Sequence, residues 1–199
     1  MTYFVTGATG FIGRYLVQSL LQKGKGTIYV LVRPKSIGKL DELREFWGAD
    51  SRKRVVPVKG DLGLPKLGVA RGDLTKLKGK VTHFYHLGAV YDLEASAEAM
   101  EKANITGTRG ALEFAEAVNA GCFHLVSSIA AAGLYRGTFS EDMFEEAEEL
   151  EHPYHRTKHD SEAMVRANGR IPFRVYRPGA VLGHSQTGFI DKIDGPYYF

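Results

Sequence analysis

The chain has 199 residues, of which 44% are hydrophobic and 25% are charged, and its formal net charge is only +3. This length suits one domain, and the low charge, with an acidic run at 141–151 that we interpret as a solvated loop or short helix, excludes a broad nucleic-acid or membrane-binding surface. The single cysteine, Cys122, excludes an internal disulfide, and we expect it to be buried and unreactive.

Short apolar runs alternate with helical patterns along the chain. The runs predicted as strands are 2–6, 27–32, 55–59, 82–87, 122–127 and 172–177. The segments predicted as helices are 10–23, 39–47, 73–78, 94–120 and 153–168. This alternation favours an α/β fold, a doubly wound parallel sheet with helices on both faces.

The N-terminus enters the first strand without a basic leader. No segment approaches the ~20 apolar residues that a membrane-spanning helix needs. We therefore expect a cytoplasmic protein without a membrane span. Since no low-complexity linker divides the pattern, residues 1–199 are expected to form one domain.

The turn after the first predicted strand is rich in glycine. The segment TGATGFIG places Gly7, Gly10 and Gly13 at intervals of three residues. Glycines there permit a tight turn, the approach of the backbone to a pyrophosphate, and close packing of the following helix. A plain strand-to-helix turn is the alternative, but the position after the first strand of an alternating pattern favours a dinucleotide site.

The second predicted strand is followed by Arg33, at the place where an acidic residue would accept a hydrogen bond from the ribose of NAD. A guanidinium suits the 2'-phosphate of NADP(H) instead, and Lys35 and Lys39 follow closely. The alternative is a solvated basic loop. The sequence thus favours NADP(H).

Two later loops carry further candidates for the cofactor site. Asp61 could accept from the adenine amino group while Leu62 packs on the ring, or Asp61 could simply stabilise a turn. Gly88 and Ala89 are small enough to let the backbone approach a cofactor. His86, just before them, is interpreted as a core or strand-end histidine.

The segment HPYHRTKHD supports two hypotheses. His152, His155 and His159 have the spacing of metal ligands on a helix, whereas Tyr154 and Lys158 share a neighbouring stripe. Three ligands on a single helix converge poorly, and no acidic partners that would orient the imidazoles are indicated. We therefore expect no metal site here.

Taken in order, the motifs resemble those of extended short-chain dehydrogenases/reductases. They are TGATGFIG, GDL, HLGA, N-x-x-G-T from Asn104, VSS ending at Ser128, Y-x-x-x-K at Tyr154 and Lys158, and RPG from Arg177. Within that superfamily, VTGATGFIGRYLV, VLVR, VSSIAAAG and GPYYF look most like bacterial fatty acyl-CoA reductases and the related thioester-reductase domains. The resemblance implies a Rossmann-type NAD(P)-binding domain.

The resemblance also implies roles for individual residues. Tyr154 would exchange the proton, Lys158 would lower its pKa and hold the nicotinamide ribose, and Ser128, with Ser127 as the fallback, would bind the substrate carbonyl. Asn104 would support the lysine through a backbone or water link. The implied cofactor-binding residues are Gly7, Thr9, Gly10, Phe11, Ile12, Gly13, Arg33, Asp61, Leu62, Leu87, Gly88, Ala89, Tyr154, Lys158, Pro178 and Gly179.

The expected function is NADPH-dependent reduction of a hydrophobic acyl thioester or aldehyde, with an acyl-CoA or an aldehyde as the leading substrate. A sugar-nucleotide epimerase/dehydratase or a ketone reductase on the same scaffold stays open, although Arg33 argues against a tightly held NAD. A non-catalytic NADP-binding regulatory module also stays open, although Tyr154, Lys158 and Ser128 argue against it. We expect a small-molecule substrate and no nucleic acid, and we leave a homodimer open.

The sequence ends in an aromatic segment, GPYYF. Large apolar side chains at a free, solvated terminus are unusual, although they could fold back on the domain. The segment therefore predicts that residues 1–199 are the N-terminal part of a longer reductase, and that a C-terminal substrate region is missing.

Overall fold

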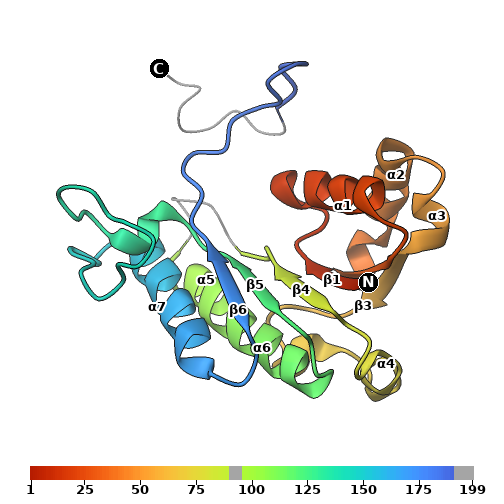
Figure 1. Ribbon diagram of the computed structural model, residues 1–199, viewed down its shortest axis with the longest axis horizontal. Coiled ribbons are helices and arrows are strands. Elements are labelled where there is room, and N and C mark those ends of the chain that lie inside the picture. The colour runs from red at the N-terminus through yellow and green to blue at the C-terminus, as the bar shows by residue number, and fades with distance from the viewer. Residues whose placement is uncertain (90–95, 191–199) are drawn as a thin grey trace.

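Six strands form a single parallel sheet in the computed structural model, which describes residues 1–89 and 96–190. The strand order is β3-β2-β1-β4-β5-β6, and every pairing is parallel (Figure 1). The bounds are β1 (Thr2–Thr6), β2 (Thr27–Val32), β3 (Val55–Lys59), β4 (His83–His86), β5 (Phe123–Val126) and β6 (Phe173–Tyr176). The predicted doubly wound α/β fold is confirmed.

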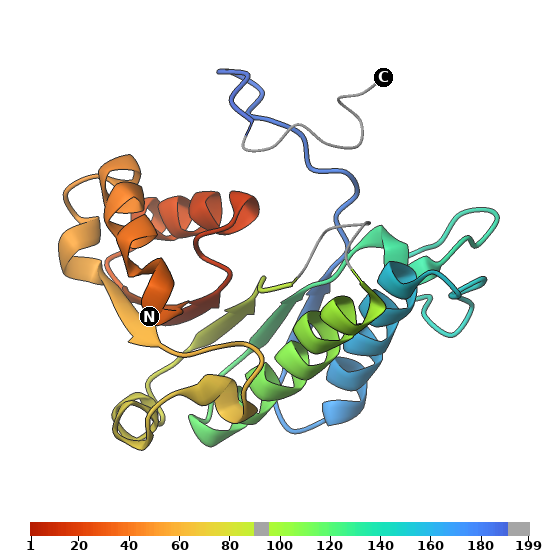
Figure 2. The same cartoon turned by 180° about the vertical axis from the view of Figure 1, so that it is seen from behind.

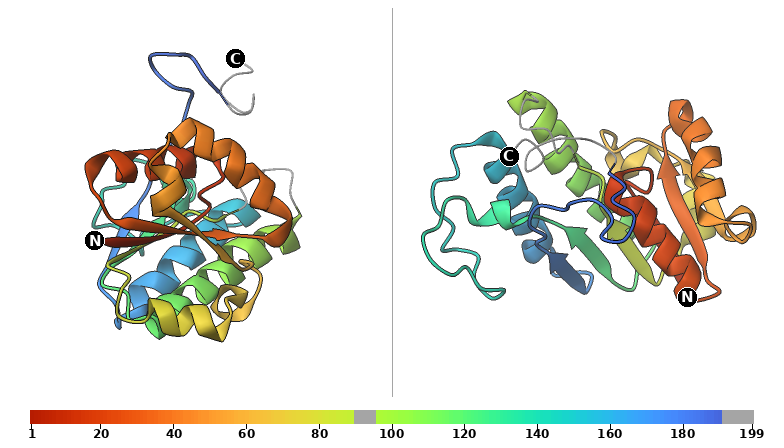
Figure 3. Two further views of the ribbon diagram at one scale, coloured as in Figure 1. Left: turned by 90° about the vertical axis from the view of Figure 1, so that its right-hand side faces the viewer. Right: turned by 90° about the horizontal axis from the view of Figure 1, so that it is seen from above.

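Helices lie on both faces of this sheet. Helices α1 and α2 lie over β1 to β3 on one face, and α6 and α7 lie on the other (Figures 1 and 2), so that the sheet is the middle of three layers (Figure 3). The helices are α1 (Phe11–Lys23), α2 (Ile37–Trp47), α3 (Ser51–Arg54), α4 (Arg71–Leu77), α5 (Ala97–Met100), the π-helical η3 (Glu101–Thr106), α6 (Gly107–Ala117) and α7 (Pro153–Asn168). Short 3-10 segments are η1 (Pro34–Ser36), η2 (Pro65–Gly68) and η4 (Ile129–Ala132).

The core has two parts because successive strand residues point to opposite faces. On the α6 side, Phe4, Phe84 and Phe123 stack along neighbouring strands with centroids 5.1 Å apart, and Phe114 of α6 packs on Phe4 at 4.5 Å. On the other side, Val5 joins the cluster formed with α1 and α2. The apolar strand runs in the sequence thus supply both cores.

The sequence predicted the regular elements well. Each predicted strand lies within one residue of an observed strand at either end, and the helix predicted at 153–168 has those bounds. The helix predicted at 94–120 is divided into α5, η3 and α6, and its first two residues lie outside the described part of the chain. A wide π turn shifts the helix register locally, and hydrophobic periodicity does not reveal it.

The acidic run is a loop that packs on α7. Its Phe144 is buried and stacks on the His159 ring at 4.3 Å, and the Arg166 guanidinium lies 4.7 Å from the Phe144 ring centroid. The prediction of a loop is therefore right, although one aromatic side chain anchors it.

Cys122 is partly exposed, so the expectation of a buried cysteine is wrong. It directly precedes β5, where the strand has not yet entered the core. Tyr197, Tyr198 and Phe199 of the aromatic segment lie outside the described residues. None of the helices in the described ranges is long and apolar enough to cross a membrane.

We predict that Gly13→Ala destabilises the fold. A Cβ atom at Gly13 would overlap the carbonyl oxygen of Gly7, so overpacking should lower the free energy of unfolding by about 1–3 kcal/mol. Gly38→Ala in α2 is the control, because an added Cβ there meets nothing within 4 Å and alanine favours the helix. Urea unfolding measures both variants, and an unchanged stability for Gly13→Ala would contradict the close packing of α1.

Candidate active site

The predicted site residues gather at the carboxyl end of the sheet. The strand order reverses between β1 and β4, and in sheets of this kind ligands bind outside the strand ends at such a reversal. The loops after β1, β2, β3 and β4 carry Gly7, Arg33, Asp61 and Gly88 respectively. Residues far apart in the sequence therefore share one edge of the sheet.

The glycine turn between β1 and α1 has the geometry that the sequence predicts. Gly7 has a φ of +72°, and a Cβ atom there would lie 2.8 Å from the nitrogen of Gly88. The N–H of Gly10 donates to the Gly7 carbonyl at 3.0 Å. Gly10 is the N-cap residue of α1, which has no side-chain cap and no acid in its first turn. The positive end of α1 is thus open to an anion, and contact with a pyrophosphate stays a prediction.

A buried hydrogen-bond chain joins the ends of β1 and β4. The Gly88 N–H donates to the Thr6 hydroxyl at 3.1 Å, and this hydroxyl lies 2.8 Å from Nδ1 of His86. Nε2 of His86 lies 3.2 Å from the Thr108 hydroxyl, so each ring nitrogen faces a hydroxyl that can either donate or accept. Burial, and then the charge of Lys158, lowers the pKa of His86 to about 3. His86 is a neutral core residue, in agreement with its interpretation from the sequence.

Tyr154 and Lys158 lie one turn apart on the buried face of α7. The helix begins at Pro153, and Nδ1 of His152 accepts from the Tyr154 N–H at 3.2 Å as its cap. The ammonium of Lys158 donates to the Val126 carbonyl at 3.4 Å, at the end of β5. Burial lowers the pKa of Lys158 to about 8. The structure thus holds a lysine with reduced basicity at the end of the sheet.

Asn104 lies in the π-helical η3 and is buried. Its side-chain amide donates to the Thr157 hydroxyl at 3.1 Å, and its backbone carbonyl accepts from the Ser161 hydroxyl at 3.0 Å. Both partners belong to α7, on either side of Lys158. Single π turns are frequent at functional sites, and this one holds Asn104 against the lysine helix. Its support of the lysine stays a prediction.

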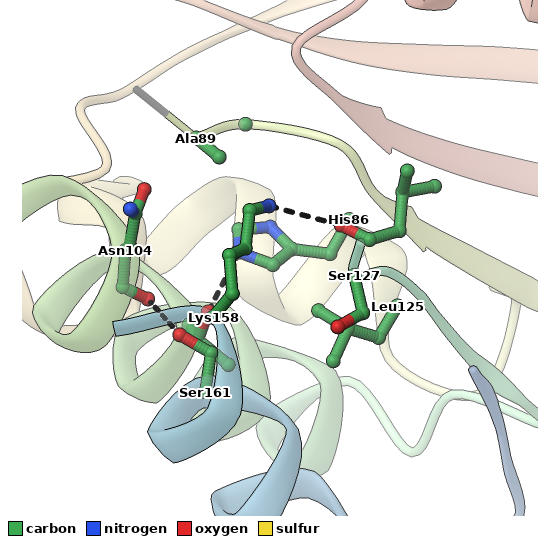
Figure 4. Close-up of a pocket in the computed structure, with 10 residues that line it drawn as sticks. His86, Ala89, Asn104, Leu125, Ser127, Lys158 and Ser161 are labelled. Carbon is green, nitrogen blue, oxygen red and sulfur yellow. Dashed lines mark hydrogen bonds between the residues drawn. The ribbon is translucent and has the colours of Figure 1, made fainter. Parts of the chain in front are cut away.

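One pocket brings Lys158 and Asn104 together with the end of β4, whereas Tyr154 and Ser128 are not among its lining residues (Figure 4). It combines the end of β4, the π turn, the end of β5 and the buried face of α7. Its lining residues are His86, Gly88, Ala89, Asn104, Thr108, Leu125, Val126, Ser127, Lys158 and Ser161. Thr108 belongs to the N-x-x-G-T motif but was given no role, and the sequence did not identify Ser161, because a single hydroxyl on a helix gives no local pattern.

The two serines after β5 differ in their surroundings. Ser127 is buried and lines the pocket, whereas Ser128 is partly exposed and begins η4. The Ser128 oxygen accepts from the Ala130 N–H at 3.1 Å, which leaves its hydroxyl proton able to donate. A donor is what a substrate carbonyl needs. Ser128 therefore remains the predicted residue, with Ser127 as the fallback.

A buried ion pair fixes α7 to the end of β6. The Glu162 side chain has no exposed surface, and its carboxylate lies 2.6 Å from Arg177 and 2.8 Å from Arg166. Burial raises the pKa of Glu162, but hydrogen bonds from the two guanidinium groups outweigh burial and leave it below the usual value. Arg177 also donates to the Met143 carbonyl at 2.8 Å. Sequence reasoning missed Glu162, because one acid on a polar helix looks solvated.

The remaining predicted residues occupy the loops that surround this edge. Arg33 is exposed directly after β2, and Asp61 accepts from the Gly63 N–H at 2.8 Å, so Asp61 does act as a turn residue. Leu62 packs against Gly88, and the carbonyl of Pro178 accepts from Ile129 at 3.1 Å. The others lie in the turns after β1, β4 and β6 or in the first turn of α1: Thr9, Phe11, Ile12, Leu87 and Gly179.

The histidines of α7 have structural contacts of their own. His152 caps the helix, and His159 lies 3.0 Å from the Ala131 carbonyl while it stacks on Phe144. His155 is partly buried beside the His152 ring, with centroids 5.2 Å apart. Tyr154 and Lys158 are buried, whereas His152 is exposed and His155 and His159 are partly buried, and the catalytic role of the tyrosine–lysine pair stays a prediction.

We predict that Lys158→Met raises the free energy of unfolding at pH 7 by up to about 3 kcal/mol. Lys158 has a folded pKa of about 8 against an ordinary value of 10.5, so folding disfavours its charged form. The free-energy cost of burying the charged Lys158 has its full size below about pH 8. It shrinks as the pH rises towards 10.5 and is absent above pH 10.5. Urea unfolding at pH 7 and pH 10 should show the variant's advantage shrinking, and an equal advantage at both pH values would contradict the lowered pKa.

Comparison with known proteins links this geometry to a group of reductases. Residues 5–199 match the family described as male sterility protein. One of the subunits of linear gramicidin synthase from Brevibacillus parabrevis is 35% identical over 205 residues, which cover 96% of this chain and 4% of that protein. A putative fatty acyl-CoA reductase of Drosophila melanogaster is 34% identical over 131 residues, which cover 58% of this chain and 25% of that protein.

Solved structures show the same fold. The terminal R domain of the myxalamid PKS-NRPS pathway has a TM-score of 0.84 and 32% identity, covering 94% of this chain and 51% of that one. UDP-glucuronic acid 4-epimerase of Bacillus cereus, solved with NAD, has a TM-score of 0.70 and 26% identity, covering 94% of this chain and 58% of that one. The chain thus spans little more than half of either. With residues 5–199 matched, it belongs to the male sterility protein family of extended short-chain dehydrogenases/reductases.

Proposed function

We propose that the chain is the cofactor-binding and catalytic part of an NADPH-dependent reductase for a hydrophobic acyl thioester, such as an acyl-CoA, or for the corresponding aldehyde. The observation that carries the proposal is the inward-facing pair of Tyr154 and Lys158 beside the end of β5, with the pKa of Lys158 near 8. The R domain and the putative fatty acyl-CoA reductase among its relatives support a thioester.

The residues at the carboxyl edge fit a nicotinamide dinucleotide. The open start of α1 and the bare backbone at Gly7 and Gly10 suit the pyrophosphate, since side chains there would block the approach. Arg33 is exposed where the adenine ribose would lie, and its fork of donors suits a 2'-phosphate. A bound nicotinamide supplies the hydride.

The protein's own groups handle the proton and the substrate oxygen. The phenol of Tyr154, with an ordinary pKa of ~10, needs a nearby cation to transfer a proton readily at neutral pH. Lys158 is mostly protonated at pH 7. One of its N–H groups donates to the Val126 carbonyl, so further N–H groups remain to donate to ribose hydroxyls. Ser128 donates to the substrate carbonyl oxygen and stabilises the charge that develops there.

A sugar-nucleotide epimerase is the second candidate, because the Bacillus cereus enzyme shares the fold. Arg33 argues against it, since a cation beside the adenine ribose favours NADP(H) over NAD(H). The regulatory alternative conflicts with the burial of Lys158, because a buried ammonium reduces stability and a module without chemistry has no use for it.

The same proposal includes a longer reductase to which residues 1–199 contribute the N-terminal part. The match to the myxalamid R domain supports this part of the proposal, because it covers 94% of this chain but only 51% of the R-domain chain. A cytoplasmic location and the open homodimer stay predictions.

We predict that Arg33→Ala weakens NADPH binding about tenfold or more and leaves NADH binding nearly unchanged. Loss of a charge-assisted contact to the 2'-phosphate costs about 1.5–3 kcal/mol. Calorimetry with both cofactors measures the effect. Lys35→Ala, an exposed cation in the adjoining η1, is the control and should change NADPH binding less. A similar loss for both cofactors would contradict the proposed contact.

We predict that Tyr154→Phe lowers turnover by ~100-fold or more while NADPH binding and folding are retained, because it removes the transferable proton and keeps the ring. NADPH oxidation with a long-chain acyl-CoA, the matching aldehyde and a UDP-sugar measures the reaction and its substrate class. His155→Ala, one residue along α7, is the control and should retain activity. Full activity of Tyr154→Phe, or turnover of the UDP-sugar alone, would overturn the proposal.

A further inference from the structure

A row of aromatic and imidazole rings lies on the sheet face opposite α6 and α7. It arises from strand alternation, because Phe84 and Phe123 point to the α6 core and their neighbours point away. Tyr85 stacks on His124 with centroids 4.3 Å apart, and His83 follows at 5.1 Å from His124. The face is open at β6, where Tyr176 is 42% exposed, whereas α1 and α2 lie over β1 to β3 (Figure 1).

Three potential metal ligands converge within this row. His83 begins β4, Cys122 directly precedes β5, and His124 is the second residue of β5. One ligand atom from each lies within 4.8 Å of the other two. Nδ1 of His83 and Nε2 of His124 are 3.0 Å apart. The register of β4 and β5 alone brings these residues together.

The distances between these ligand atoms suit a cation with tetrahedral coordination. Zinc–nitrogen bonds of about 2.0–2.1 Å and zinc–sulfur bonds of about 2.3 Å place tetrahedral ligand atoms roughly 3.3–3.7 Å apart. The observed separations require shifts of only a fraction of an ångström to about one ångström. Two imidazoles and one thiolate are a ligand set that Zn²⁺ accepts, and soft sulfur disfavours Mg²⁺ and Ca²⁺.

We propose that His83, Cys122 and His124 bind one Zn²⁺ ion, with a fourth position open to water. His83 and Cys122 are partly exposed, so solvent reaches the site, whereas His124 is buried and anchors it. The site lies on the opposite face of the sheet from the pocket of Lys158, and at the other ends of the strands. It is therefore separate from the proposed reaction, and its role is to tie β4 to β5.

The hydrogen bond behind His124 supports this assignment. Nδ1 of His124 lies 3.0 Å from the Tyr176 hydroxyl, which can accept its N–H and so leave the Nε2 lone pair for the metal.

One feature opposes binding and is outweighed. Arg174 is a cation near the cluster, yet it is exposed, so solvent screens its repulsion of the metal. Without a metal, hydrogen bonds between Tyr176, His124 and His83 satisfy the same groups.

Calorimetric titration of the metal-free chain with Zn²⁺ tests the proposal. We expect one equivalent to bind, and Cys122→Ser and His83→Gln each to weaken binding at least tenfold. Tyr176→Phe, which keeps the ring, should weaken it less. His155→Gln on α7 is the matched control and should bind as the wild type does. Thermal melting without metal verifies that each variant is folded, and Zn²⁺ should raise the melting temperature of the wild type but not of Cys122→Ser.

Cobalt supplies an independent readout of the sulfur ligand. Co²⁺ should give a thiolate-to-metal charge-transfer absorption that Cys122→Ser abolishes and His155→Gln retains. Absence of Zn²⁺ binding, or binding that neither Cys122→Ser nor His83→Gln weakens, would overturn the proposal. NADPH binding should be the same with and without Zn²⁺, so failure of the metal site and failure of the proposed reductase function are distinguishable.

Discussion

The contact between the first glycine turn and the end of β4 is the constraint on which the site depends. Gly7 can approach Gly88 only because neither residue carries a side chain, since a Cβ at Gly7 would lie 2.8 Å from the Gly88 nitrogen. The Thr6 hydroxyl accepts from Gly88 and bonds His86 in the same place. The turn before α1 and the loop after β4 are therefore held in direct contact. The loops for a dinucleotide lie on one side of this contact, and the pocket of Lys158 lies on the other.

Helix α7 carries two buried charged side chains one turn apart, and the two differ in their hydrogen-bond and ion-pair partners. Glu162 is fully paired with Arg166 and Arg177, so its charge serves to hold the helix against the end of β6. Lys158 has one long hydrogen bond to the Val126 carbonyl. Its remaining N–H groups can bind a ligand, and burial lowers its pKa. Burial of the Lys158 ammonium lowers the stability of the fold, and a destabilising buried charge of this kind is expected at a catalytic position.

Much of the fold and part of the site follow from local sequence, and the rest follows from contacts between distant segments. Pro153 and Gly169 mark the ends of α7, and the apolar runs mark the strands. The π turn at Asn104 gives no sequence signal, because its shift of the helix register is too local for hydrophobic periodicity to reveal. His83 and Cys122 are equally unpredictable, because strand register alone brings them together. Prediction from the sequence therefore misses residues whose contacts lie on other helices and strands.

The two faces of β4 and β5 serve different chemistry because their side chains alternate. His86 of β4 and Ser127, just after β5, point to the pocket beside α7. His83 of β4 and His124 of β5 point to the opposite face of the sheet, where the row of aromatic and imidazole rings lies. A cation that joins the starts of these strands would resist their sliding, and a shift by one residue would exchange the two faces. Register, more than any single contact, then determines whether Lys158 meets its pocket partners. Metal binding at one end of the strands would thus favour the alignment that the other end requires.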